Sequence, residues 1–78
     1  MNTQTEELQK SLLEICNQIF REEVEIDLHR DQFPKWDSLR HVELIVAVQK
    51  KFNIKLSANE MINIRQLVDL LKILESKI

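Results

Sequence analysis

The sequence predicts an all-α protein, a small helical bundle of three longer helices plus one short helix. Its 78 residues include 44% hydrophobic and 31% charged side chains, a balance typical of one small folded domain spanning residues 1–78. The chain contains no glycine, so the Asn-Gly and Asp-Gly turns of tight β-hairpins are absent. Apolar residues recur at three- and four-residue spacing in three segments, which is the period of helices packed on one face.

The first helix is predicted over residues 6–20. Its apolar face consists of Leu8, Leu12, Ile15 and Ile19, with Leu13, Cys16 and Phe20 beside them. Thr3 or Thr5 is expected to cap the N-terminus, and Glu6 and Glu7 suit the positive end of the helix dipole.

Residues 24–36 lose the helical period and contain Pro34, the only proline of the chain. A connection of about a dozen residues is long for a small domain, and such loops often wrap the fold or carry function. The apolar side chains of this segment are Val24, Ile26, Leu28, Phe33 and Trp36. We expect them to fold back onto the core.

The second helix is predicted to begin after Asp37, a good N-cap residue, and to end near Asn53, which tolerates the left-handed conformation of a C-cap. Lys50 and Lys51 suit the negative end of its dipole. Its apolar positions are Leu39, Val42, Leu44, Ile45, Val46, Ala47, Val48 and Phe52. Because this helix has so many apolar positions, we expect it to be the most buried of the helices. Val42→Ala is therefore expected to destabilise the fold.

A short helix and a final helix are predicted in the C-terminal third. After an extended link, Ser57 and Glu60 form an S-x-x-E capping box, which predicts a short helix over residues 58–62. Asn63 is expected to cap the last helix. The inward face of that helix consists of Ile64, Leu67, Leu70, Leu71 and Leu74. Leu71→Ala is therefore also expected to destabilise the fold.

Charge and cysteine content argue against several classes of function. The 11 basic and 13 acidic side chains leave a formal net charge of −2, which gives no support to nucleic-acid binding. No apolar stretch reaches the roughly 18 residues of a membrane span, and the polar N-terminus is unlike a secretory signal. Cys16 is the only cysteine, so we expect no internal disulfide and a reducing, cytoplasmic setting. Cys16, His29 and His41 lack the spacing of metal ligands.

The segment Trp36-Asp37-Ser38-Leu39 begins the second predicted helix. The first turn of a helix presents unpaired backbone N–H groups and the positive end of the dipole, so an anion attached to the Ser38 hydroxyl would be stabilised there. A phosphodiester fits that description. Asp and Ser are also common helix-starting residues, so the motif by itself is compatible with a purely structural role.

The longer run WDSLRHVELIVAVQKKFNIKL, followed by the Glu60 capping box and by LVDLL, resembles the acyl carrier and peptidyl carrier protein family. The resemblance implies that Ser38 is the attachment residue for a 4′-phosphopantetheine arm from coenzyme A, with Asp37 and Leu39 beside it in the D-S-L motif. It also implies a carrier and not an enzyme. The thiol of the arm would hold an acyl or aminoacyl group as a thioester, and Ser38 would be a substrate position.

The resemblance further implies partners. They are a phosphopantetheinyl transferase, an enzyme that loads the acyl or aminoacyl group, and a downstream transferase or synthase. No nucleic acid and no membrane are expected, and the chain is expected to be a monomer. The residues expected to contact partners are Trp36, Arg40, His41 and Glu43. For Trp36 the other interpretation is a lid packed beside the helix start, and for His41 a solvent-facing position.

A pocket that shelters the acyl group would be lined by apolar side chains behind Ser38. The four residues expected to line it are Ile45, Val48, Met61 and Leu67. The alternative is that all four only pack in the core.

The charge of the second predicted helix departs from that of fatty-acid carriers, which resemble one another in a strongly acidic second helix. Here Asp37 and Glu43 are opposed by Arg40, Lys50 and Lys51, which leaves this helix with a net charge of +1. Arg40 stands directly after D-S-L, where fatty-acid carriers usually have an acid. Because charge complementarity governs partner choice, we expect dedicated enzymes of a specialised biosynthetic pathway.

Two alternatives to a carrier remain open from the residues alone. The first is an unmodified helical interaction module that binds a partner through its second helix; normal function of Ser38→Ala would favour it. The second is a small hydrolase that uses Ser38, His41 and Asp37, which would also need an oxyanion hole and a pocket. A chain of 78 residues has little room for a deep catalytic cleft, so we do not expect an enzyme.

Overall fold

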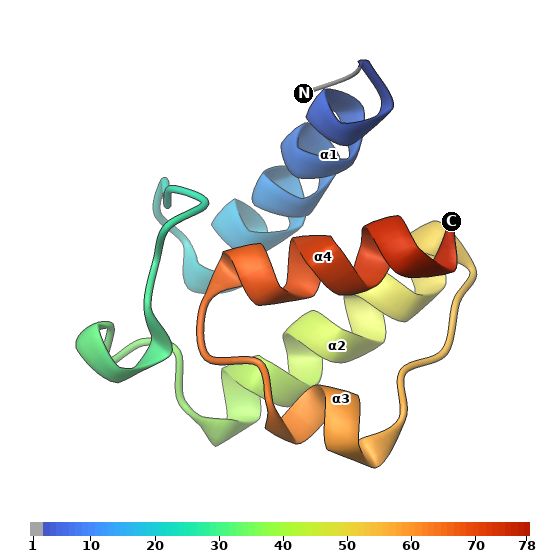
Figure 1. Cartoon of the computed structure of the whole chain (residues 1–78). Coiled ribbons are helices and arrows are strands. Elements are labelled where there is room, and N and C mark those ends of the chain that lie inside the picture. The colour runs from blue at the N-terminus through green and yellow to red at the C-terminus, as the bar shows by residue number, and fades with distance from the viewer. Residues whose placement is uncertain (1–2) are drawn as a thin grey trace.

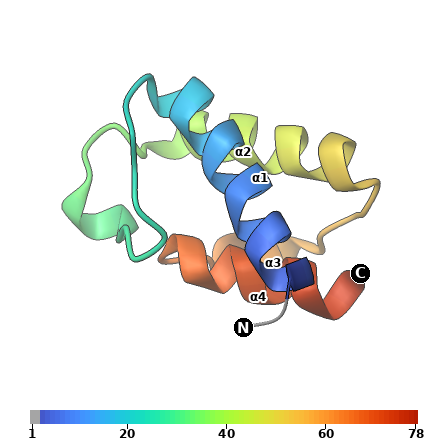
Figure 2. The ribbon, with the colours of Figure 1, turned by 90° about the horizontal axis from the view of Figure 1, so that it is seen from above.

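The structure, a computed structural model that describes residues 3–78, is all-α, with three longer helices and one short helix in that range, as the sequence predicts (Figure 1). The elements are α1 (Thr3–Phe20), a 3-10 turn η1 (Arg30–Gln32), α2 (Ser38–Phe52), α3 (Ala58–Ile62) and α4 (Leu67–Lys77). In both ribbon views α2 and α4 run in the same general direction and α1 runs against them (Figures 1 and 2). The short α3 precedes α4 (Figure 1), and a hydrogen bond between His41 and the Met61 carbonyl joins it to α2.

Helix ends agree with the prediction where the signal is local. The Asp37 side chain accepts a hydrogen bond from the backbone N–H of Arg40 (2.8 Å) and caps α2. Asn53 ends α2 in the left-handed conformation (φ 55°, ψ 50°). At α3, the Glu60 N–H donates to Ser57 Oγ (3.1 Å) and the Ser57 N–H donates to Glu60 Oε1 (2.8 Å), which confirms the capping box.

Helix α1 begins earlier than the apolar pattern predicts. It starts at Thr3, so Thr5 lies inside the helix and neither threonine is the cap residue; the position before Thr3 lies outside the described residues. After the helix, Arg21 turns the chain with a positive φ of 59°. Asn17 Oδ1 then accepts a hydrogen bond from the backbone N–H of Val24 (2.9 Å), which folds the start of the loop back against the last turn of α1.

The last helix begins later than predicted, at Leu67, and Asn63 ends α3 instead of capping α4. The Asp69 carboxylate fixes this start because it accepts hydrogen bonds from the backbone N–H groups of Arg65 (3.0 Å) and Gln66 (3.1 Å). An acceptor three residues after the cap position satisfies N–H groups that have no partner in the helix. Only Asn63 was considered as the start signal in the sequence, and Asp69 was overlooked.

One hydrophobic core joins the helices. It consists of Leu8, Leu12, Cys16, Phe20, Trp36, Leu44, Ile45, Val48, Leu56, Ile64, Leu67, Leu70, Leu71 and Leu74. The loop side chains pack against this core as predicted; those that are partly buried there are Val24, Ile26, Leu28 and Phe33. Trp36 is only 3% exposed, and its ring lies 5.8 Å from that of Phe20, so it closes the core beside the start of α2.

The apolar residues of α2 divide between two faces. Leu44 and Val48 are buried, whereas Leu39, Val42 and Val46 are 61%, 60% and 44% exposed. The three exposed residues follow i, i+3, i+7 spacing and therefore form a stripe of their own on the helix surface. The expectation that they face inward was wrong, because the core contacts of α2 need only one of its two apolar stripes.

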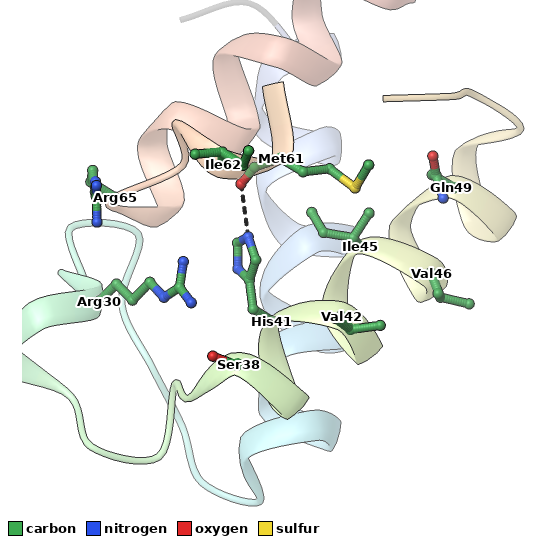
Figure 3. Close-up of a pocket in the computed structure, with 10 residues that line it drawn as sticks. All are labelled: Arg30, Ser38, His41, Val42, Ile45, Val46, Gln49, Met61, Ile62 and Arg65. Carbon is green, nitrogen blue, oxygen red and sulfur yellow. Dashed lines mark hydrogen bonds between the residues drawn. The ribbon is translucent and has the colours of Figure 1, made fainter. Parts of the chain in front are cut away.

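His41 is a buried polar residue that joins three segments. Trp36 Nε1 donates to His41 Nδ1 (2.9 Å), and His41 Nε2 lies 2.9 Å from the carbonyl oxygen of Met61 in α3 (Figure 3). Because an indole N–H can only donate, Nδ1 must accept and the ring proton is assigned to Nε2, which donates to Met61. This arrangement fits the neutral imidazole. Burial lowers the pKa of His41, the nearby Arg30 charge lowers it further, and the Met61 hydrogen bond opposes both.

Leu71→Ala is predicted to reduce the free energy of unfolding by about 2–5 kcal/mol, because it leaves a cavity in the core. The expectation that Val42→Ala destabilises the fold is wrong, because Val42 is exposed; as the matched control, this change is predicted to alter the free energy of unfolding by no more than about 0.5 kcal/mol. Urea unfolding followed by circular dichroism measures both. Equal losses in the two variants would contradict the burial of α2 described above.

The free energy of unfolding is predicted to fall as the pH drops below about 6.5, the usual pKa of histidine. Below that pH His41 is protonated in the unfolded chain, whereas in the folded protein its lowered pKa keeps it neutral. His41→Gln should flatten this part of the stability–pH curve. His29→Gln, which removes the other histidine from the surface, is the control. Urea unfolding at several pH values between about 7 and 5 is the measurement; a curve flattened by His29→Gln and not by His41→Gln would refute the assignment.

Candidate functional site

Ser38 is the first residue of α2 and is exposed. The preceding residue, Asp37, fixes the start of the helix with two hydrogen bonds. Its side chain accepts one from the backbone N–H of Arg40, and its carbonyl oxygen accepts one from the backbone N–H of His41 (2.9 Å). The Ser38 hydroxyl therefore stands on a fixed turn at the surface. An anion attached there would meet the positive end of the α2 dipole.

An apolar groove of about 450 Å³ opens beside Ser38, between α2 and α3 (Figure 3). Its apolar walls are Val42, Ile45 and Val46 from α2 and Met61 and Ile62 from α3, and its polar lining is Arg30, Ser38, His41, Gln49 and Arg65. Gln49 Oε1 already accepts a hydrogen bond from the backbone N–H of Leu56 (2.9 Å). The groove thus offers mainly apolar surface next to one exposed hydroxyl.

Two of the four residues expected to line an acyl pocket lie in this groove, and two do not. Ile45 and Met61 form part of its walls. Val48 and Leu67 are completely buried and belong to the core, so for them the alternative of core packing applies. Val42 and Ile62, which the sequence did not single out for this role, line the groove instead.

The residues expected to contact partners also separate into two groups. Arg40 and Glu43 lie on the surface of α2, with Arg40 Nη1 3.7 Å from Glu43 Oε1, and their role toward partners stays a prediction. Trp36 and His41 are only 3% and 8% exposed. The interpretation of Trp36 as a lid beside the helix start is confirmed, because its ring packs in the core. The expectation that His41 faces solvent was wrong, because its hydrogen bond to Trp36 holds it inside the fold.

The geometry argues against a Ser–His hydrolase. Both ring nitrogens of His41 are engaged, Nδ1 by Trp36 and Nε2 by the Met61 carbonyl, so neither can take a proton from Ser38. The Asp37 carboxylate is occupied by the cap of α2. A general base needs a free nitrogen within hydrogen-bond reach of the hydroxyl.

Other kinds of site find no support in the described residues. Within residues 3–78, no three His, Cys, Asp or Glu side chains lie close enough together to hold a metal ion. None of the helices in that range is long and apolar enough to cross a membrane. Burial raises the pKa of the Cys16 thiol to about 12, so this side chain is not a nucleophile at neutral pH.

An exposed apolar stripe begins next to Ser38 and was missed in the sequence. Leu39, Val42 and Val46 of α2 belong to it, together with Ile62 of α3, which is 64% exposed. The signal was present in the spacing, because α2 has more apolar residues than one buried face can use. Arg30 and Arg65 were missed for another reason: no local pattern shows that residues from two distant loops share one groove.

Comparison with known proteins agrees with this fold and site. The solution NMR structure of a holo acyl carrier protein from Geobacter metallireducens matches with a TM-score of 0.78 and 25% sequence identity, covering 90% of this chain and 84% of that chain. No protein-family model and no curated protein matches. The chain therefore has the fold of an acyl carrier protein, the family that its sequence resembles.

Proposed function

We propose that this protein is an acyl or aminoacyl carrier that holds a biosynthetic intermediate as a thioester on a 4′-phosphopantetheine arm attached to Ser38. One observation carries the proposal. The exposed Ser38 hydroxyl stands at the first turn of α2, beside an apolar groove, in a fold like that of a holo acyl carrier protein. The cargo would be presented to other enzymes and not transformed by this chain.

The residues around Ser38 fit such an arm. Asp37 fixes the turn without using the Ser38 hydroxyl, and both Ser38 and Leu39 are exposed. When bound, the arm supplies a thiol that carries the acyl group. The chain itself contributes a rigid attachment point and, through Ile45 and Met61, apolar surface on which an acyl chain can rest.

The modifying transferase must bring its own catalytic groups, because His41 has no free nitrogen for Ser38. Docking of this transferase, of a loading enzyme and of a downstream transferase or synthase is assigned to the surface around Ser38. There the exposed apolar stripe offers contact area, and Arg40 and Glu43 add charge. Arg40 in place of an acid favours partners of a specialised pathway over those of fatty-acid synthesis.

An unmodified interaction module is the second candidate function. The same exposed stripe favours it, since apolar contact with a partner would explain why Leu39, Val42 and Val46 are left outside the core. The two functions differ in what happens at Ser38, which makes chemical modification of that residue the decisive test.

Incubation with coenzyme A and a broad-specificity phosphopantetheinyl transferase is predicted to add one phosphopantetheinyl group, seen by intact mass. Ser38→Ala should add none. Ser57→Ala is the matched control: it changes another serine at a helix start and should still be loaded, with a loss of stability of about 1 kcal/mol from its cap. Failure of folded wild-type protein to gain mass with two different transferases would refute the carrier and leave the interaction module.

A further inference from the structure

Two arginines line the groove beside Ser38, and within residues 3–78 no acidic side chain lines it. In Figure 3 the Arg30 side chain extends toward Ser38 and His41, and Arg65 stands apart from these three side chains. Arg30 is half-buried and Arg65 is exposed. The mouth of an otherwise apolar groove is therefore positively charged.

The fold itself fixes the position of Arg30. The neighbouring residue His29 forms an antiparallel β-bridge with Gln66. Within it the Arg30 N–H donates to the Arg65 carbonyl (2.8 Å), and the Leu67 N–H donates to the Leu28 carbonyl (3.1 Å). These bonds tie the loop before α2 to the loop before α4, so both arginines are held at the same groove by backbone contacts and not by their own side chains.

Neither guanidinium belongs to an ion pair found among residues 3–78. Of the acids in nearby segments, Glu43 lies against Arg40 and Asp69 accepts the backbone N–H groups before α4, while Asp31, next to Arg30 in the chain, does not line the groove. The charge of Arg30 also reaches the interior, where it contributes to lowering the pKa of His41. A half-buried guanidinium without a carboxylate partner is ready to bind an anion that arrives from outside.

We propose that Arg30, supported by Arg65, forms an anion site that holds the phosphate ester carried on Ser38 and turns the attached arm into the groove between α2 and α3. This inference rests on the modification of Ser38 proposed above. A planar guanidinium can donate two parallel hydrogen bonds to phosphate oxygens, and the N-terminus of α2 adds its dipole. Arg30 acts as a positioning residue, and no bond is made or broken there.

The direct test is NMR of the side-chain Nε–Hε group of each arginine, before and after loading, with intact mass to show that loading is complete. The Arg30 resonance should move on loading. The Arg40 resonance is the internal control, because Arg40 lies two residues from Ser38 but pairs with Glu43 and does not line the groove. The phosphorus chemical shift of the loaded protein should change in Arg30→Gln and stay unchanged in Arg40→Gln.

A second readout is the rate at which iodoacetamide alkylates the terminal thiol of the arm. Cys16 does not interfere, since it is completely buried and its pKa is about 12. Arg30→Gln should raise this rate about two- to five-fold, the size expected for one partly exposed ionic contact. About 1 M NaCl should raise the wild-type rate in the same way and leave Arg30→Gln unchanged, because salt screens the contact.

The outcomes separate the two proposals. Complete loading with an unmoved Arg30 resonance and equal alkylation rates would overturn the anion site and leave the carrier function standing. A resonance that moves at Arg40 in place of Arg30 would overturn it as well. If no variant is loaded, the carrier function fails and the anion site fails with it.

Discussion

The hydrogen bonds of the buried His41 ring determine the arrangement around the groove. An imidazole inside a core must have both nitrogens satisfied, and here Trp36 and the Met61 carbonyl do so from two different segments. Helix α3 has no fully buried residue; it is held by the partly buried Met61 side chain, by this hydrogen bond and by the Glu60–Lys77 ion pair (3.2 Å). The ring thus links the two walls of the groove and, for the same reason, has no nitrogen left for chemistry at Ser38.

Helix α2 serves two surfaces at once. One stripe, with Leu44 and Val48, closes the core, and a second stripe, with Leu39, Val42 and Val46, is exposed to solvent. A domain of this size has a small hydrophobic core, and leaving three aliphatic side chains exposed gives up stability that their burial would add. A contiguous exposed apolar surface of this kind indicates a binding role. Contact with partners, as proposed above, supplies that role without any rearrangement of the fold.

Local sequence patterns predicted the helices well, whereas contacts between residues far apart in the chain could not be predicted from the sequence. The caps Asp37, Asn53 and the Ser57–Glu60 box involve residues within four positions of each other, so their patterns are complete in the sequence. The role of Ser38 came from the D-S-L motif together with the resemblance of a longer run to carrier proteins, and it stays a prediction. The inward turn of His41 depends on a carbonyl 20 residues away, and the meeting of two arginines depends on a bridge between distant loops. No periodicity records such contacts.

The complete burial of Cys16 matters for a protein that carries its cargo on a foreign thiol, as proposed here. Transthioesterification and disulfide exchange both proceed through a thiolate, and an accessible second thiol in the same molecule would compete at a high effective concentration. Such a residue would intercept the cargo or oxidise together with the arm. Enclosing Cys16 among the side chains of the core removes this competition, because the thiol is neither accessible nor ionised. A single thioester on the arm can then stay intact between one enzyme and the next.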